Sequence, residues 1–79
     1  MLVQVKLFAN LQRYWPSVPA GQATPINLPE GSTVGDLIRH LAIRENEIKV
    51  TFVNGRARAE LYRLKEGDEV GIFPPVGGG

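Results

Sequence analysis

Apolar and polar residues alternate at the start of the chain, "LVQVKLF". In an extended segment, the polar residues Gln4 and Lys6 would share one face and three aliphatic residues would share the other. These aliphatic residues are Val3, Val5 and Leu7. Because a period of two residues is typical of a strand with one buried face, the pattern predicts a β-strand from Leu2 to Phe8.

The following stretch, "ANLQRYWPSVPAGQATP", contains three prolines and a glycine among polar residues. Proline and glycine interrupt regular elements, so we expect one helical turn at its start and a loop after it. Trp15 lies in this stretch, and we expect it to cover the core rather than to act as an exposed anchor. The next residues, "INL", predict a short second strand that ends at Pro29.

The segment "EGSTVGDLIRHLAI" has the clearest helical pattern in the chain. Its apolar residues recur at spacings of three and four, which places them in one stripe along a helix. The stripe consists of Val34, Leu37, Ile38, Leu41 and Ala42. Thr33 is the expected N-cap, with the Asp36 carboxylate near the positive end of the helix and Ser32 as the competing cap. His40 lies off the stripe, which favours a solvated side chain over a metal ligand.

After a polar hinge, "RENEI", the run "KVTFVNGRARA" is interrupted by Asn54-Gly55. This pair tolerates the positive φ angles of a two-residue hairpin turn, so the run predicts two antiparallel strands. In "LKEGDEVGIF", a glycine-containing turn precedes alternating Val70 and Ile72, which predict a final strand. The acidic residues Glu66, Asp68 and Glu69 fit a turn better than a pair of carboxylates for acid and base catalysis.

This order of elements predicts the α+β class: a mixed sheet of four to five strands curled around one main helix. The first and final strands are both apolar, so we expect them to be parallel neighbours at the centre of the sheet, with the shorter strands at its edges. The length of 79 residues allows a single domain. We expect this domain to span residues 1–75 and a flexible glycine-rich tail to span residues 76–79.

Composition excludes several kinds of site. The chain has no cysteine, which rules out disulfides, thiolate-bound metals and a thiol nucleophile of its own. The formal charge is +1, so no strong field attracts nucleic acid or an anionic membrane. Four basic residues near the hairpin are expected to be solvated rather than bound to RNA: Arg56, Arg58, Arg63 and Lys65. Without a membrane-length apolar stretch or a signal-peptide pattern, the sequence predicts a cytoplasmic protein.

The last residues, "IFPPVGGG", provide the strongest indication of function. Pro74 and Pro75 end the final strand and direct the chain away from the sheet, because proline cannot donate a ladder hydrogen bond. The glycines Gly77, Gly78 and Gly79 have no side chains, so a tail of this kind fits a narrow channel. Glycine-rich ends often have no function, but here they follow directly from a strand and a stiff Pro-Pro step.

The functional group of such a tail would be the α-carboxylate of Gly79. Adenylation by ATP would create a leaving group, and a partner's persulfide could then convert the carboxylate to a thiocarboxylate, a covalent sulfur donor. Phe73, Pro74, Pro75 and Val76 are candidates for an apolar patch that docks on partners. The alternative for Phe73 is ordinary packing at a sheet edge.

Four segments together resemble the ubiquitin-like sulfur carriers of the β-grasp fold: "EGSTVGDLI", "VNGR", "LKEGDEV" and "IFPPVGGG". This family contains the small subunit of molybdopterin synthase and the thiamine sulfur carrier. The resemblance implies a carrier without catalytic activity and without a bound cofactor, loaded by an adenylyltransferase related to ubiquitin-activating enzymes. It also implies a persulfide sulfur donor and, as a partner, the large subunit of molybdopterin synthase.

Within this family, the Phe-Pro-Pro-Val step and "LFA" are most similar to the molybdopterin-synthase small subunit, which indicates a role in molybdenum or tungsten cofactor synthesis. Gly77 departs from the small polar residue often found there, so thiamine synthesis or another pathway stays open. Two other classes are alternatives. One is a regulatory or RNA-binding module that resembles TGS domains, and the other is a ubiquitin-like protein modifier.

Overall fold

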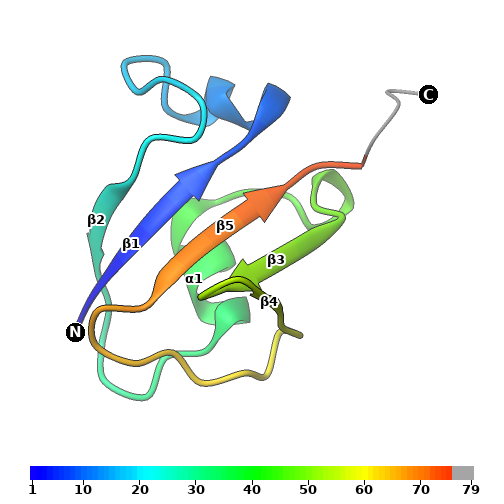
Figure 1. Ribbon diagram of the computed structural model, residues 1–79. Helices are drawn as coiled ribbons and strands as arrows, with labels where there is room; N and C mark the ends of the chain where they lie inside the picture. Colours follow the sequence, from blue (N-terminus) through cyan, green and yellow to red (C-terminus); the bar gives the residue numbers. More distant parts are fainter. Residues whose placement is uncertain (76–79) are drawn as a thin grey trace.

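The computed structural model describes residues 1–75, in which five strands form one sheet and an α-helix lies against one of its faces (Figure 1). The strands are β1 (Leu2–Leu7), β2 (Thr24–Asn27), β3 (Val50–Val53), β4 (Arg56–Ala57) and β5 (Glu69–Phe73), and the helix is α1 (Val34–Leu41). Two short 3₁₀ helices, η1 (Ala9–Tyr14) and η2 (Glu45–Glu47), lie in the connections. The predicted α+β, β-grasp class is confirmed, whereas the tail predicted for residues 76–79 lies outside the described residues.

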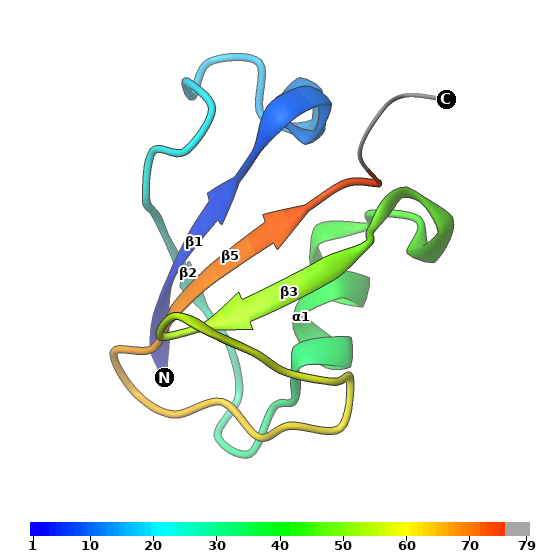
Figure 2. The ribbon, with the colours of Figure 1, turned by 45° about the vertical axis from the view of Figure 1, so that its right-hand side comes forward.

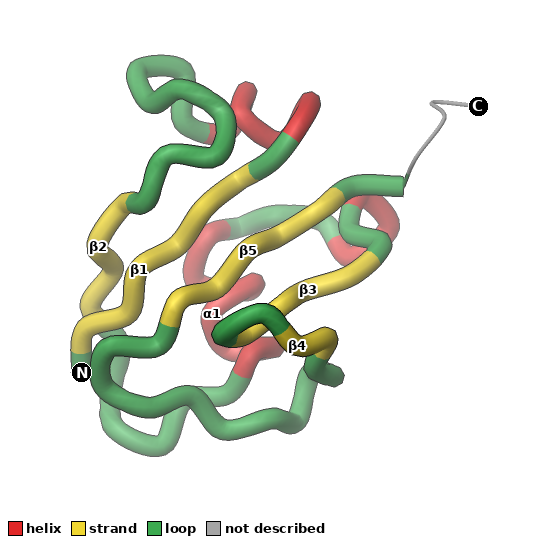
Figure 3. The backbone as a smooth tube through the Cα atoms, in the orientation of Figure 1, coloured by secondary structure: helices red, strands yellow, loops and turns green. Residues whose placement is uncertain are grey.

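The strand order is β2-β1-β5-β3-β4, and β1 and β5 run parallel at its centre (Figure 2). Leu7 pairs with Ile72, so residues at opposite ends of the sequence are neighbours in the sheet. The other strand pairs are antiparallel, and the two edges are the short strands β2 and β4 (Figure 3). Both expectations, a parallel central pair and short strands at the edges, are confirmed.

Strand β2 begins two residues earlier than predicted and contains Pro25. The N–H of Leu28 donates to the carbonyl of Met1 at 2.8 Å, and strand alternation then directs the nitrogens of Ile26 and Thr24 toward β1 as well. The nitrogen of Pro25 faces the open edge, where no ladder hydrogen bond is lost. The sequence interpretation treated this proline as part of the loop, but an edge strand accommodates it.

Helix α1 begins with a complete capping box. The Thr33 hydroxyl accepts a hydrogen bond from the N–H of Asp36 at 3.1 Å, and the Asp36 carboxylate accepts one from the N–H of Thr33 at 2.9 Å. Thr33 is therefore the N-cap, and the alternative, Ser32, is wrong because its hydroxyl donates to the carbonyl of Pro29 instead. Ala42 was wrongly placed on the apolar stripe: it is exposed, has a φ of 59° and ends the helix.

The first turn of α1 is held by the segment between β4 and β5. The N–H of Val34 donates to the carbonyl of Tyr62 at 3.0 Å, and the N–H of Gly35 donates to that of Glu60 at 2.9 Å. A Cβ at Gly35 would lie 3.4 Å from both the Cβ and the carbonyl oxygen of Glu60. The absence of a side chain at Gly35 therefore allows the helix and this segment to approach each other closely.

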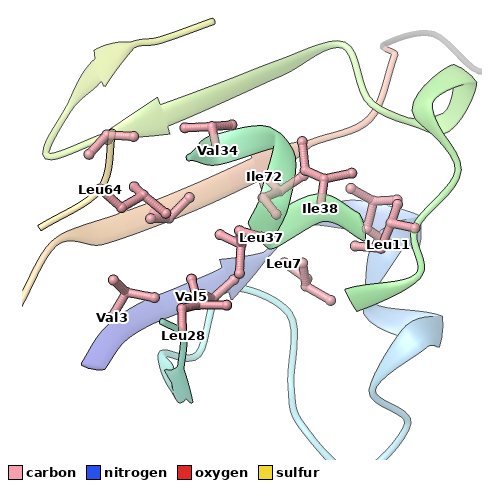
Figure 4. Close-up of a cluster of buried hydrophobic side chains, with 13 residues drawn as sticks. Val3, Val5, Leu7, Leu11, Leu28, Val34, Leu37, Ile38, Leu64 and Ile72 are labelled. Atoms are coloured by element: carbon pink, nitrogen blue, oxygen red, sulfur yellow. The ribbon is translucent and has the colours of Figure 1, made fainter. Parts of the chain in front are cut away.

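The core lies between α1 and the inner face of the sheet (Figure 4). It contains aliphatic residues from every strand except the short edge strands, together with residues from α1, η1 and the connecting segments. The members are Val3, Val5, Leu7, Leu11, Leu28, Val34, Leu37, Ile38, Ile43, Val53, Leu64, Val70 and Ile72. Trp15 packs against this core, as expected. No helix within residues 1–75 has the length and apolar character needed to cross a membrane.

We expect the variant Asp36→Ala to lower thermal stability at neutral pH and to have less effect in acid. Hydrogen bonds from the Thr33 backbone, the Arg39 side chain and the Thr33 hydroxyl hold the pKa of Asp36 below its ordinary value. A lowered pKa stabilises the fold above the unfolded-state pKa, and this contribution is lost as the pH falls through the folded-state value. The difference in melting temperature between the wild type and the variant should therefore shrink as the pH is lowered from about 7 to about 2. A constant difference over this range would contradict the interpretation.

Candidate functional site

The end of β5, from which the predicted tail departs, is held on both sides. The N–H of Lys49 donates to the carbonyl of Phe73 at 2.8 Å, and the N–H of Phe8 donates to the carbonyl of Ile72 at 3.2 Å. Pro74 is half-buried and Pro75 is exposed. The sheet thus holds the chain up to Phe73, and β5 ends directly before the two prolines, as the sequence predicted.

Three aromatic side chains gather next to this point on the face of the sheet that α1 does not cover. The rings of Phe8 and Phe73 stack with centroids 4.2 Å apart and planes 4° apart. The ring of Phe52 meets Phe73 edge to face, with centroids 5.5 Å apart. All three residues are half-buried. Aromatic groups in this state provide large apolar contact areas for a partner.

Gly71 forms the floor beneath these rings. A Cβ at Gly71 would lie 3.1 Å from the Phe8 ring and 3.5 Å from the Phe73 ring, so the glycine leaves room for Phe8 to lie across β5. The rings and the glycine border a hollow of about 330 Å³, which we call the aromatic hollow. Its lining residues are Lys6, Phe8, Phe52, Gly55, Glu69, Val70, Gly71 and Phe73.

The aromatic hollow has the chemistry of a docking surface. Its two ionisable side chains, Lys6 and Glu69, face each other across β1 and β5 at 3.9 Å. Both are substantially exposed, so this ion pair contributes little to stability. The rest of the lining is apolar or glycine, which suits an apolar side chain of another protein rather than a reacting group.

The placement of Phe73 corrects one alternative from the sequence. Packing at a sheet edge is wrong for this residue because β5 is the central strand. The other candidates adjoin it: Pro74 and Pro75 follow directly, whereas Val76, Gly77, Gly78 and Gly79 lie outside the described residues.

Sequence reasoning missed Phe8, Phe52 and Gly71, although a signal for the first was available. Odd-numbered residues of β1 are buried, so Phe8 falls on the outer face. The parallel register that joins Leu7 to Ile72 then brings Phe8 beside Phe73. Combining the alternation with the expected strand pairing would have predicted this contact.

The remaining candidates are placed as solvated or turn residues. His40 and the four basic residues near the hairpin are exposed. Asp68 is buried and closes the turn before β5: its carboxylate accepts hydrogen bonds from the Asn54 amide at 2.9 Å and from the N–H of Lys65 at 2.8 Å. This role agrees with the expected turn.

We expect the variant Gly71→Ala to displace the Phe8 ring and to destabilise the protein by roughly 1–3 kcal/mol, because the added methyl group overpacks the contact. Urea unfolding measures the cost, and the resonances of Phe8 and Phe73 report the ring positions. In a Phe8→Ala background the same change at Gly71 should cost much less, since the clashing ring is absent. Equal costs in both backgrounds would contradict this packing.

Comparison with known proteins gives consistent results. The model of the ThiS family matches residues 5–79. A Pyrococcus furiosus structure assigned as molybdopterin converting factor subunit 1 is 34% identical, with coverage of 96% of this chain and 99% of the other and a TM-score of 0.76. The small archaeal modifier protein SAMP1 of Haloferax volcanii is 28% identical over 100% of both chains, with a TM-score of 0.74.

A third structure, the complex of subunits 1 and 2 of the molybdopterin-converting factor from Helicobacter pylori, shares the fold. It is 22% identical over 100% of both chains, with a TM-score of 0.65. No curated protein sequence matches this chain.

Proposed function

The chain belongs to the ThiS family, and we propose that it is the sulfur carrier of molybdopterin synthesis, acting as the small subunit of molybdopterin synthase. The observation that carries this proposal is the fixed exit of the chain at Phe73, next to the aromatic hollow and directly before Pro-Pro-Val-Gly-Gly-Gly. The similarity to the Pyrococcus furiosus subunit 1 supports the choice of molybdopterin over thiamine.

The proposed chemistry takes place at the carboxylate of Gly79, in the active sites of partners. A carboxylate oxygen attacks the α-phosphorus of ATP, which releases pyrophosphate and leaves an acyl-adenylate. The terminal sulfur of a partner's persulfide then attacks the acyl carbon and expels AMP. A second partner thiol cleaves the resulting acyl-persulfide, so the chain retains a thiocarboxylate and the partner retains a disulfide.

The folded body provides recognition and direction. Fully extended, the six residues from Pro74 onward reach at most about 20 Å, so a partner that takes up Gly79 must also approach the end of β5. The aromatic hollow lies at this place and offers an apolar surface. We propose the adenylyltransferase and the large synthase subunit as the two partners that use it in turn, so that each excludes the other.

A second candidate function has a specific observation in its favour. The structural similarity to the Haloferax volcanii modifier protein extends over both chains. In a modifier, the same acyl-adenylate would pass its acyl group to a lysine amine of a target protein instead of to sulfur. The two functions share activation and differ in the acceptor.

The deciding experiment combines the purified chain with ATP, a purified adenylyltransferase related to ubiquitin-activating enzymes and a persulfide donor. The product is then analysed by intact mass spectrometry. A carrier should gain the mass difference of one sulfur replacing one oxygen, and it should then support molybdopterin formation with the large subunit. Attachment to lysine without any sulfur-containing form would favour the modifier. Thiazole formation with thiamine enzymes, but no molybdopterin, would overturn the pathway assignment.

A further inference from the structure

The hairpin turn between β3 and β4 contains a chemically reactive pair of residues, Asn54-Gly55. Both residues are exposed, and both have positive φ angles, 51° for Asn54 and 85° for Gly55. The pair suits a tight turn, but an asparagine that precedes a glycine also has a reaction of its own. Because glycine has no side chain, its backbone nitrogen can approach the carboxamide of the preceding asparagine with little steric hindrance.

This reaction is a deamidation that consumes only water. The backbone nitrogen of Gly55 loses its proton to solvent and attacks Cγ of Asn54, which forms a new C–N bond. The bond between Cγ and Nδ2 then breaks, and the nitrogen takes up a proton and leaves as ammonia. Water opens the resulting succinimide at one of its two carbonyls, which yields aspartate or isoaspartate. The rate of such an intramolecular attack depends on how closely the two reacting atoms are held.

The fold holds the Asn54 carboxamide by hydrogen bonds at both of its ends. Its Nδ2 donates to Oδ1 of Asp68 at 2.9 Å, and its Oδ1 accepts from the N–H of Glu69 at 3.0 Å. Asp68 is itself fixed, because it is buried and its other carboxylate oxygen accepts from the N–H of Lys65 at 2.8 Å. Attack requires Cγ of Asn54 to approach the Gly55 nitrogen, and these hydrogen bonds restrain that movement.

Deamidation would replace a favourable contact by a repulsive one. A carboxylate at position 54 has no hydrogen to donate, and it would face the Asp68 carboxylate where a hydrogen bond of 2.9 Å now exists. Two like charges at this separation repel, and the burial of Asp68 strengthens the repulsion. In the isoaspartate product, a side-chain carbon also enters the backbone and lengthens the two-residue turn that sets the register of β3 and β4.

The affected turn borders the aromatic hollow. Gly55 and Glu69 both belong to the lining of the hollow, and the Asn54 carboxamide joins the turn to Glu69. We propose that Asn54 is a site of spontaneous deamidation, that its hydrogen bonds to Asp68 and Glu69 restrain the reaction in the folded chain, and that the product loosens this wall of the hollow. The reaction and its restraint do not depend on the proposed function.

The first test follows the folded wild-type chain in warm, mildly alkaline buffer by peptide mapping with mass spectrometry. Aspartate and isoaspartate should accumulate at position 54, whereas the three other asparagines should stay intact because each precedes a larger residue. These are Asn10, Asn27 and Asn46. The chain unfolded in guanidinium chloride lacks both hydrogen bonds and should react about tenfold faster or more at position 54. Equal rates in the folded and unfolded chains would overturn the restraint, and an intact Asn54 in both would overturn the site.

The role of Asp68 is tested by the variant Asp68→Ala. It removes one of the two hydrogen bonds and should raise the rate at Asn54 about two- to tenfold. The matched control Glu66→Ala removes a nearby carboxylate whose partner is the N–H of Leu2, so it should react like the wild type. A wild-type rate in the folded Asp68→Ala chain would overturn the role of Asp68. If thermal unfolding shows that this variant does not fold, the comparison of folded and unfolded wild-type chains still decides whether the fold restrains the reaction.

The effect of the product is tested by exchanging the two side chains. The variant Asn54→Asp should lower the melting temperature, and adding Asp68→Asn should restore most of it. The amide introduced at position 68 can donate to the carboxylate at position 54 and still accept from the N–H of Lys65. The resonances of Phe52 and Gly55 should shift in the single variant and return in the double variant. A single variant as stable as the wild type, or no recovery in the double variant, would overturn the proposed effect on the hollow.

Discussion

A chain extended by one alanine after Gly79 should form no detectable thiocarboxylate and should fold as well as the wild type. The extension moves the carboxylate one residue away from the position at which an adenylating site would hold it, and proximity accounts for a large part of catalysis. It also places a methyl group where a channel shaped for glycine has no room. Intact mass spectrometry after incubation with ATP, adenylyltransferase and sulfur donor measures the loss.

The fold should be unaffected, because the core of the described residues is built from side chains between Val3 and Ile72. Equal melting temperatures of the extended and wild-type chains are the necessary control. The variant Gly77→Ser leaves the terminal Gly-Gly intact and should still form the thiocarboxylate. It therefore distinguishes a requirement for glycine at the terminus from a loss of loading caused by any change in the tail. Normal loading of the extended chain would contradict the proposed role of Gly79.

The variant Leu37→Ala should produce the largest loss of stability. Leu37 is 0% exposed and lies on the face of α1 that covers the sheet. Truncation of a buried leucine to alanine costs about 2–5 kcal/mol through lost burial and the cavity left behind. A domain of 79 residues has a total stability of roughly 4–12 kcal/mol, so this loss is a large fraction of the total.

Urea denaturation gives the free energy of unfolding for this variant. Leu41→Ala, at the half-buried end of the same helix, is the matched control and should cost clearly less. Similar costs at both positions would mean that α1 does not pack on the sheet through Leu37 as the structure shows.

The elements that follow a local pattern were predictable from the sequence. Alternation identified β1, the spacings of three and four residues from Val34 to Leu37 and Ile38 identified α1, and Asn54-Gly55 identified the hairpin. Each of these signals acts over a few residues, so a single sequence contains it in full. The expected parallel pairing of β1 with β5 was also correct, because two apolar strands require central positions.

The features that were missed depend on contacts between distant residues. Gly71 resembles any strand glycine until the Phe8 ring is known to lie over it. Gly35 resembles an ordinary helix residue until the carbonyl of Glu60 approaches. Ala42 continued the apolar spacing, but the helix ends there in a left-handed conformation, which alanine seldom adopts. The spacing of residue types along the sequence contains no information about these contacts between distant residues.

The central position of β5 also has a consequence for biosynthesis. This strand comes from residues 69–73, yet it separates β1 from β3, so the sheet cannot close while the ribosome still holds that segment. Until then, the strands that precede β5 would form an incomplete sheet with exposed apolar surface. Nascent chains in such a state are prone to aggregate. Folding should therefore be completed only after residues 69–73 have left the ribosome, so the Phe8–Phe73 ring pair forms in the last step of sheet assembly.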